Sequence, residues 1–196
     1  MMRKAVMERR TKETDIRLEL CLEGSGQTEL ATGVGFFDHM LDALCRFAQF
    51  DLKVACTGDL HVDAHHTVED VGICLGKALR EALGDRAGIR RVGSACMPMD
   101  ESLAFAAIDI SGRPYLAFDA DFTAPMVGAF DTQLAEEFFR AVAVNAGLTV
   151  HMRLLAGRND HHKLEALFKA FGLALRDAAA VDPRVMGVLS TKGALD

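Results

Sequence analysis

The motif His-His-x-x-Glu occurs twice in this chain, and this repeat constrains the fold more than any other feature. It begins at His65 and again at His161, which lies 96 residues later. The correspondence continues without a gap, because residues 76–82 (GKALREA) match residues 172–178 (GLALRDA). Either similarity alone could arise by chance on a helix, but the two in one register indicate an internal duplication. We therefore predict two half-repeats, residues 1–90 and 91–196, that form one functional domain.

The predicted secondary structure also repeats. In the first half, the residue patterns predict strands at 16–22 and 51–56 and amphipathic helices at 36–47 and 67–83. In the second half, they predict strands at 102–110, 115–122 and 149–155 and helices at 134–146 and 162–180. Strands grouped with two helices in each half favour an α+β fold. We expect each half to be a mixed sheet covered on one face by two helices, with the two halves packed together.

Composition and charge exclude several classes of protein. The formal net charge of −6 disfavours non-specific nucleic-acid binding. No stretch is long and apolar enough to predict a membrane span, and the first ten residues lack the apolar segment of a secretory signal. Five scattered cysteines without CxxC spacing indicate buried thiols in a reducing compartment. We expect a cytoplasmic protein with neither a membrane nor a nucleic acid as partner.

The repeated motif predicts metal binding. In each copy the glutamate follows the two histidines by three and four residues, a spacing that places all three near one helix face. Imidazole nitrogens with carboxylate oxygens suit Mn, Fe, Co or Zn. A single copy is more typical of a solvated helix start, but two copies in register hold four of the seven histidines. The predicted ligands are His65, His66, Glu69, His161, His162 and Glu165.

Each site needs a further ligand, and the first helix of each half offers one. His39 is the candidate in the first half. With a two-residue loop difference, the repeat pairs residues 38–41 with residues 136–139, which places Glu137 opposite His39. His151 is an alternative to Glu137, but a lone histidine on a strand is more often structural or a substrate contact. His61 is interpreted as a loop residue or as one that supports the ligands without contacting the metal.

A second group of residues has the chemistry of an anion site. Residues 189–193 (LSTKG) combine a hydroxyl pair, an ammonium group and a glycine that permits close backbone approach. Arg91, Arg113 and Lys169 could add positive charge, although Arg113 alone is more typical of a solvated turn. Lys169 is favoured because it lies one helical turn beyond the second motif. Taken in isolation, Glu13 is an ordinary surface carboxylate.

Together these motifs resemble the imidazoleglycerol-phosphate dehydratase family of histidine biosynthesis, in its monofunctional form. The resemblance runs in order from about residue 9 to residue 193, through FFDHM at 36–40, HHTVED at 65–70, SGRPY at 111–115, HHKLEA at 161–166 and STKG at 190–193. It implies a duplicated α+β unit of the ribosomal protein S5 domain 2-like kind. It also implies a 24-subunit homo-oligomer with active sites between subunits, and two Mn²⁺ ions in each active site.

The resemblance assigns roles to individual residues. Glu13 would be an acid–base residue. Many relatives have His where this chain has Glu137, a departure that would shift the metal preference towards harder ions. An aspartate commonly stands where this chain has Ala64, and its loss would remove a hydrogen bond around the ligands. The metal ligands carried over by motif would be His39, His65, His66, Glu69, His161, His162 and Glu165, and the repeat adds Glu137 as the candidate for the eighth. The phosphate contacts would be Arg91, Arg113, Lys169, Ser190 and Lys192.

The implied reaction converts D-erythro-imidazole-glycerol phosphate to imidazole-acetol phosphate and water. The proton to be removed is on a carbon that bears no carbonyl, so an ordinary enolate route is closed. Two metal ions that bind the substrate imidazole would favour its imidazolate form, which makes the ring an electron reservoir. Loss of the C3 hydroxyl gives a diazafulvene-like intermediate, Glu13 takes the C2 proton, and the enol becomes the ketone.

Two other functions share parts of this pattern. A di-iron carboxylate oxidoreductase carries Glu-x-x-His pairs on four long helices, whereas here the order is His-His-x-x-Glu and strands separate the helices. A metal-organised structural or storage shell would assemble with metal but would not consume imidazole-glycerol phosphate.

Overall fold

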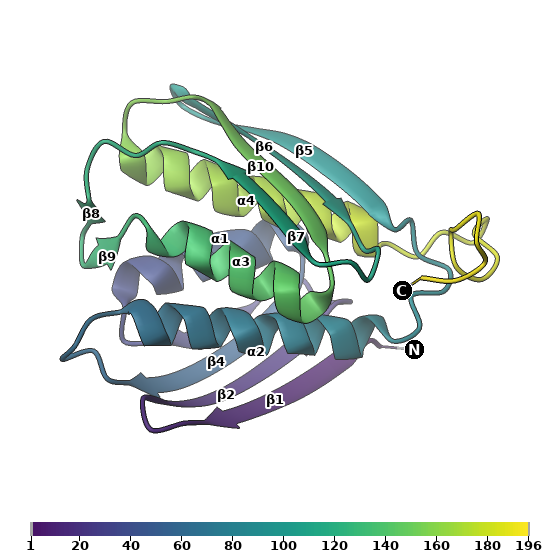
Figure 1. Ribbon diagram of the computed structural model, residues 1–196, viewed down its shortest axis with the longest axis horizontal. Helices are drawn as coiled ribbons and strands as arrows, with labels where there is room; N and C mark the ends of the chain where they lie inside the picture. The colour runs from purple at the N-terminus through teal and green to yellow at the C-terminus, as the bar shows by residue number, and fades with distance from the viewer. Residues whose placement is uncertain (1, 196) are drawn as a thin grey trace.

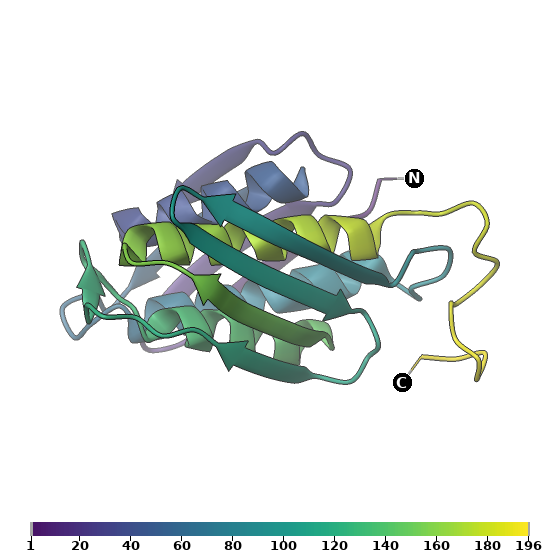
Figure 2. The same cartoon turned by 90° about the horizontal axis from the view of Figure 1, so that it is seen from above.

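The computed structural model describes residues 2–195, which fold into four layers, with a sheet on each outside and two layers of helices between them (Figures 1 and 2). Both four-stranded sheets are mixed, because each contains one parallel strand pair among antiparallel ones. The predicted α+β fold of duplicated, one-face-covered sheets is confirmed. No helix of the described residues is long and apolar enough to cross a membrane.

The first half forms one sheet and its two helices. Its sheet has the strand order β1-β2-β4-β3, with β3 parallel to β4. Strand β2 alternates buried and exposed residues along most of its length, which is the pattern of a sheet with one face on the core. The elements are β1 (Lys4–Arg10), β2 (Thr14–Cys21), β3 (Thr28–Ala31), α1 (Gly35–Ala48), β4 (Asp51–Gly58) and α2 (His65–Leu83).

The second half repeats this arrangement. Its sheet has the order β5-β6-β10-β7. The strands that correspond in the sequences of the two halves therefore occupy corresponding positions in the two sheets. A short hairpin of β8 and β9 is added before the third helix and has no counterpart among the described elements of the first half. The elements are β5 (Val92–Met99), β6 (Ser102–Asp109), β7 (Tyr115–Asp119), β8 (Met126–Val127), β9 (Phe130–Asp131), α3 (Leu134–Ala146), β10 (Thr149–Ala156) and α4 (Asp160–Ala179).

The helices of the two halves pack across the centre of the molecule. Helix α1 packs on α4 and α2 packs on α3, so each contact joins opposite halves. The glycine of the repeat makes both approaches possible. A Cβ on Gly76 would lie 2.8 Å from the Val142 carbonyl oxygen, and a Cβ on Gly172 would lie 2.4 Å from the Leu44 carbonyl oxygen. The repeated glycine therefore lets helices from opposite halves lie close together.

Replacing Gly172 by Ala should test this packing. We expect the free energy of unfolding to fall by about 1–3 kcal/mol or more, because the added methyl meets backbone rather than a flexible side chain. Gly35→Ala is the matched control, since nothing lies within 4 Å of its added Cβ in the first turn of α1. It should leave stability unchanged or raise it by up to about 1 kcal/mol. Denaturant unfolding of metal-free protein measures both; equal stability of the two variants would contradict the close approach.

Candidate functional site

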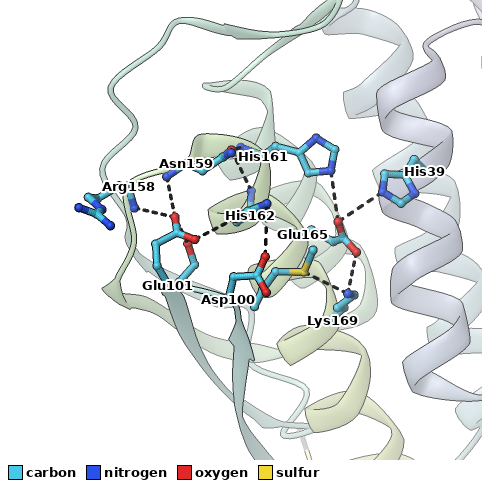
Figure 3. A network of polar contacts seen from close by, with 11 residues as sticks. His39, Asp100, Glu101, Arg158, Asn159, His161, His162, Glu165 and Lys169 are labelled. Atoms are coloured by element: carbon cyan, nitrogen blue, oxygen red, sulfur yellow. Dashed lines mark hydrogen bonds and ion pairs between the residues drawn. The ribbon is translucent and has the colours of Figure 1, made fainter.

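The second histidine pair lies in the first turn of α4. Asn159 is the N-cap residue of that helix, and its side-chain oxygen accepts hydrogen bonds from the backbone N–H of His161 at 2.9 Å and of His162 at 3.4 Å. This cap fixes where the helix begins and therefore fixes the backbone positions from which the two imidazole rings project. The ring planes of His161 and His162 lie 82° apart, with centroids separated by 6.1 Å. The two rings therefore face different surroundings, as Figure 3 shows.

His161 meets His39 and Glu165 in one cluster. The Glu165 Oε2 atom lies 3.2 Å from His161 Nε2 and 3.4 Å from His39 Nε2 (Figure 3). One ligand atom from each residue lies within 4.8 Å of the other two. Among the described residues, 2–195, this is the one group of at least three His, Cys, Asp or Glu side chains whose ligand atoms lie this close together. His39 comes from the first half and the other two from the second, so the packing of α1 on α4 builds the cluster. Two imidazole nitrogens and a carboxylate oxygen fit a divalent transition-metal ion.

Lys169 fixes the charge of the glutamate in this cluster. Its Nζ lies 2.6 Å from Glu165 Oε1, on the oxygen that does not face the histidines (Figure 3). Burial alone would raise the pKa of Glu165, whose side chain is only 9% exposed, but the Lys169 hydrogen bond and charge together with His39 lower it below its ordinary value. Lys169, which was predicted to contact phosphate, thus lies beside the candidate metal ligands in this chain.

The counterpart of this cluster in the first half is more open. His39 and Glu137 each lie ten residues before the left-handed residue that ends their helix, Gln49 and Gly147, which supports the predicted pairing of the two positions. Glu137 and His65 line one cavity of about 440 Å³ at the N-terminal ends of α3 and α2. Glu137 Oε2 also lies 3.7 Å from Arg140 Nε. His65, Glu69 and Glu137 are not drawn together as tightly as the His39 cluster within the described part of the chain.

The second histidine of each pair is held by a carboxylate. His66 Nδ1 lies 3.0 Å from Asp59 Oδ2, and His162 Nδ1 lies 2.8 Å from Glu101 Oε2. These hydrogen bonds are the main cause of a raised pKa at both histidines. Neither Asp59 nor Glu101 was predicted from the sequence, although the position of Glu101 carries a signal. It directly precedes Ser102 in the β5–β6 turn, as Glu13 precedes Thr14 in the β1–β2 turn.

Glu13 faces the other nitrogen of the first pair. Its Oε1 lies 3.8 Å from His66 Nε2, and its side chain is 51% exposed. The turn that carries it is fixed by Thr11, whose hydroxyl oxygen accepts from the Glu13 N–H at 3.1 Å and from the Thr14 N–H at 3.0 Å. Glu13 therefore combines a fixed backbone with an accessible carboxylate beside a candidate ligand.

Asp160 directly precedes the second histidine pair, but its hydrogen bonds go to other residues and not to the two imidazole rings. Asp160 accepts from Lys163 Nζ at 2.7 Å and from the hydroxyl of Thr123 at 2.8 Å, and it thereby anchors the loop before β8. In the repeat, Ala64 corresponds to Asp160 and Thr67 corresponds to Lys163. The first half therefore lacks both members of this ion pair. The departure at Ala64, the N-cap residue of α2, accordingly comes with a second change in the first turn of that helix.

The predicted anion residues other than Lys169 gather at one cavity. Arg91, Arg113, Ser190 and Lys192 line a space of about 660 Å³ under the C-terminal tail. Arg91 is held by two hydrogen bonds to Asp109, at 2.6 and 2.9 Å, and by one to the Leu189 carbonyl at 2.7 Å. An arginine fixed in this way keeps its positive charge in place at the edge of the cavity.

The anion cavity and the histidine motifs lie at opposite ends of the folded molecule. Helices α2 and α4, which carry the motifs at their starts, both begin at the left of Figure 1, and the tail follows the other end of α4 (Figures 1 and 2). The 20 residues of α4 separate the two regions by about 30 Å. One small substrate cannot contact both regions of the same chain.

Comparison with known proteins identifies relatives along the whole chain. The profile of the family described as imidazoleglycerol-phosphate dehydratase matches residues 32–175. An imidazoleglycerol-phosphate dehydratase from Symbiobacterium thermophilum is 62% identical over 187 residues, which cover 95% of this chain and 90% of that protein. One from Desulfitobacterium hafniense is 58% identical over 194 residues and covers 99% of each.

Solved structures show the same similarity. The crystal structure of imidazoleglycerol-phosphate dehydratase from Staphylococcus aureus aligns with a TM-score of 0.83 at 40% identity, over 91% of this chain and 99% of that one. The structure of IGPD from Pyrococcus furiosus in complex with (S)-C348 aligns with a TM-score of 0.83 at 40% identity, over 96% of this chain and 100% of that one.

Proposed function

The chain belongs to the imidazoleglycerol-phosphate dehydratase family, and from this premise we propose that it converts D-erythro-imidazole-glycerol phosphate to imidazole-acetol phosphate and water in histidine biosynthesis. The observation that carries the proposal is the cluster of His39, His161 and Glu165, built from both halves of the repeat. It favours metal-dependent chemistry on a ring that is itself a good metal ligand.

We propose two Mn²⁺ ions in each active site. His39, His161 and Glu165 would hold one of them, since the donors already converge and Lys169 keeps the glutamate ionised. Their repeat counterparts would contribute to the other. When bound, such an ion supplies Lewis acidity that favours the deprotonated form of the substrate imidazole. The full proposed set is His39, His65, His66, Glu69, Glu137, His161, His162 and Glu165.

The chain's own residues then hold the substrate and move its proton. Arg91, Arg113, Ser190 and Lys192 would bind the phosphate, with Arg91 positioned by Asp109. A phosphate held at a fixed place limits how the carbon chain can lie and brings its reacting carbons to one position. Glu13 would accept the C2 proton, because its carboxylate is accessible and lies beside His66.

The placement of these groups supports an active site shared between copies of the chain. The phosphate cavity and the histidine motifs lie about 30 Å apart along α4. A substrate that contacts both must therefore take its phosphate contacts from one copy and its metal contacts from another. We propose a homo-oligomer for this reason, and a 24-subunit shell by family resemblance.

A direct assay tests the proposed function. Purified protein loaded with Mn²⁺ should consume imidazole-glycerol phosphate and release imidazole-acetol phosphate. Chelation should stop turnover, and added Mn²⁺ should restore it. Metal-dependent assembly without loss of substrate would instead favour the structural or storage shell. An optical signal from an oxidised di-iron centre, in place of this turnover, would favour the oxidoreductase.

A further inference from the structure

The turn between β5 and β6 carries Glu101, a carboxylate that has no role in the proposed reaction described so far. We propose that Glu101 is a positioning residue, which holds the His162 ring through Nδ1 so that Nε2 is free to bind metal. The inference rests on the proposed metal centre and extends it to a residue outside the predicted ligand set. It concerns how one ligand is oriented, not which residues bind the ion.

The first observation is the contact itself. Glu101 Oε2 lies 2.8 Å from His162 Nδ1, a short and direct hydrogen-bond distance (Figure 3). Asp100, the neighbouring residue, lies on the other side of the ring, with its Oδ2 3.9 Å from Nε2. The Glu101 carboxylate thus bonds to Nδ1, the ring nitrogen that would not bind a metal ion held at Nε2.

The second observation is that Glu101 is itself held in place. Its other oxygen, Oε1, accepts from the backbone N–H of Asn159 at 2.8 Å and of Arg158 at 3.1 Å, and from the Ser102 hydroxyl at 3.3 Å. These hydrogen bonds to Oε1 leave Oε2 directed at the His162 ring, so the ring meets a carboxylate that is fixed in place.

The third observation comes from the duplication. Glu13 occupies the equivalent turn in the first half, but its carboxylate faces His66 Nε2 at 3.8 Å and leaves Nδ1 to Asp59. Its side chain is 51% exposed, whereas that of Glu101 is 27% exposed. One copy of the turn thus presents an exposed carboxylate, and the other presents a carboxylate held by hydrogen bonds. In both halves, however, a carboxylate holds Nδ1 of the second histidine.

The chemical consequence concerns the tautomer of His162. A carboxylate can only accept, so the neutral ring must donate its proton from Nδ1, and Nε2 keeps the lone pair that a metal requires. Partners of this kind fix the orientation of a ligating histidine and increase its basicity. Glu101 would therefore act on metal affinity without contacting the ion.

Two substitutions separate this role from simple support of the loop. In Glu101→Gln, the amide oxygen can still accept from the Asn159 and Arg158 N–H groups, which places the amide NH₂ against His162 Nδ1. That donor would force the proton to Nε2 and block the metal-binding nitrogen. In Glu101→Ala, both the loop contacts and the ring contact are lost. Gln should therefore preserve the fold but not the metal site.

The measurements are Mn²⁺ binding, followed by the electron paramagnetic resonance signal of free Mn²⁺, and the Tm of the metal-free protein. We expect Glu101→Gln to weaken one class of Mn²⁺ sites by roughly 10- to 100-fold while its Tm stays close to that of wild type. Glu101→Ala should lower both. Glu29→Gln is the matched control, because it makes the same change at an exposed carboxylate of β3, paired with Lys53; it should bind Mn²⁺ as wild type does.

Two results would overturn the inference, and they are distinguishable. If Glu101→Gln binds Mn²⁺ as tightly as wild type while Glu101→Ala loses both affinity and Tm, Glu101 only supports the loop before α4. If wild-type protein itself binds no Mn²⁺, the proposed metal centre is wrong and the positioning role falls with it. Nitrogen-15 spectra of the metal-free protein should report the proton of His162 on Nδ1 in wild type and on Nε2 in Glu101→Gln.

Discussion

Replacement of Glu13 by Gln should lower kcat by about two to four orders of magnitude and leave the Mn²⁺ content unchanged. General acid–base catalysis by one positioned side chain contributes a factor of this size. An amide has almost the same shape as the carboxylate but cannot accept a proton in the reaction. The backbone of Glu13 is fixed by Thr11 and by a bond from the Asp59 N–H to the Glu13 carbonyl at 3.0 Å, so the turn should keep its conformation.

Glu8→Gln is the matched control for this prediction. Glu8 lies on β1 of the same hairpin, is exposed and pairs with Arg17, away from the histidines. The same loss of charge there should leave turnover unchanged. Steady-state kinetics with Mn²⁺ and a metal determination on each variant are the required measurements. Full activity in Glu13→Gln would remove Glu13 from the reaction, and loss of Mn²⁺ together with turnover would make it a metal ligand instead.

The duplication explains why so much of the fold was predictable. A lag of 96 residues that holds over the motif and the helix behind it implies that both halves place the same elements in the same order. The strands that were missed lack the usual signals. β3 has only four residues, β5 contains Gly93 and Pro98, and β1 ends in charged residues. β1 and β5 are edge strands, where proline and charge are tolerated.

The candidate site was predictable to the extent that it follows from helix spacing. Spacing of three and four residues placed Glu165 near His161, as the structure has it. It did not reveal that His39 packs against this pair, because periodicity shows which face of a helix is buried but not which helix covers it. Glu101 was missed for a related reason. Its turn repeats at a lag of 88 residues instead of 96, and its contact with His162 exists only once β5 and β6 have paired beside α4.

Replacement of His161 by Ala should have the largest effect on metal binding. Loss of a residue that only orients a ligand costs roughly 10- to 100-fold in affinity, so loss of a ligand itself should cost more than about 100-fold. Turnover should fall to background, because the substrate imidazole would meet an incomplete centre. The fold should survive, since Glu165 keeps its bond to Lys169 at 2.6 Å and its contact with His39 at 3.4 Å. The buried carboxylate is therefore not left as an unpaired charge.

His151→Ala provides the control and tests the alternative eighth ligand. Val150 and Met152 on either side of His151 are buried against the helices, so His151 projects from the opposite face of the sheet, where its ring lies 6.0 Å from that of Tyr115. The His151→Ala variant should therefore retain both Mn²⁺ ions and turnover, whereas His161→Ala should lose one ion. Metal stoichiometry and the Tm of metal-free protein distinguish the two variants. Two tightly bound ions in His161→Ala would contradict the cluster as a metal site, and loss of an ion in His151→Ala would restore His151 as a ligand in place of Glu137.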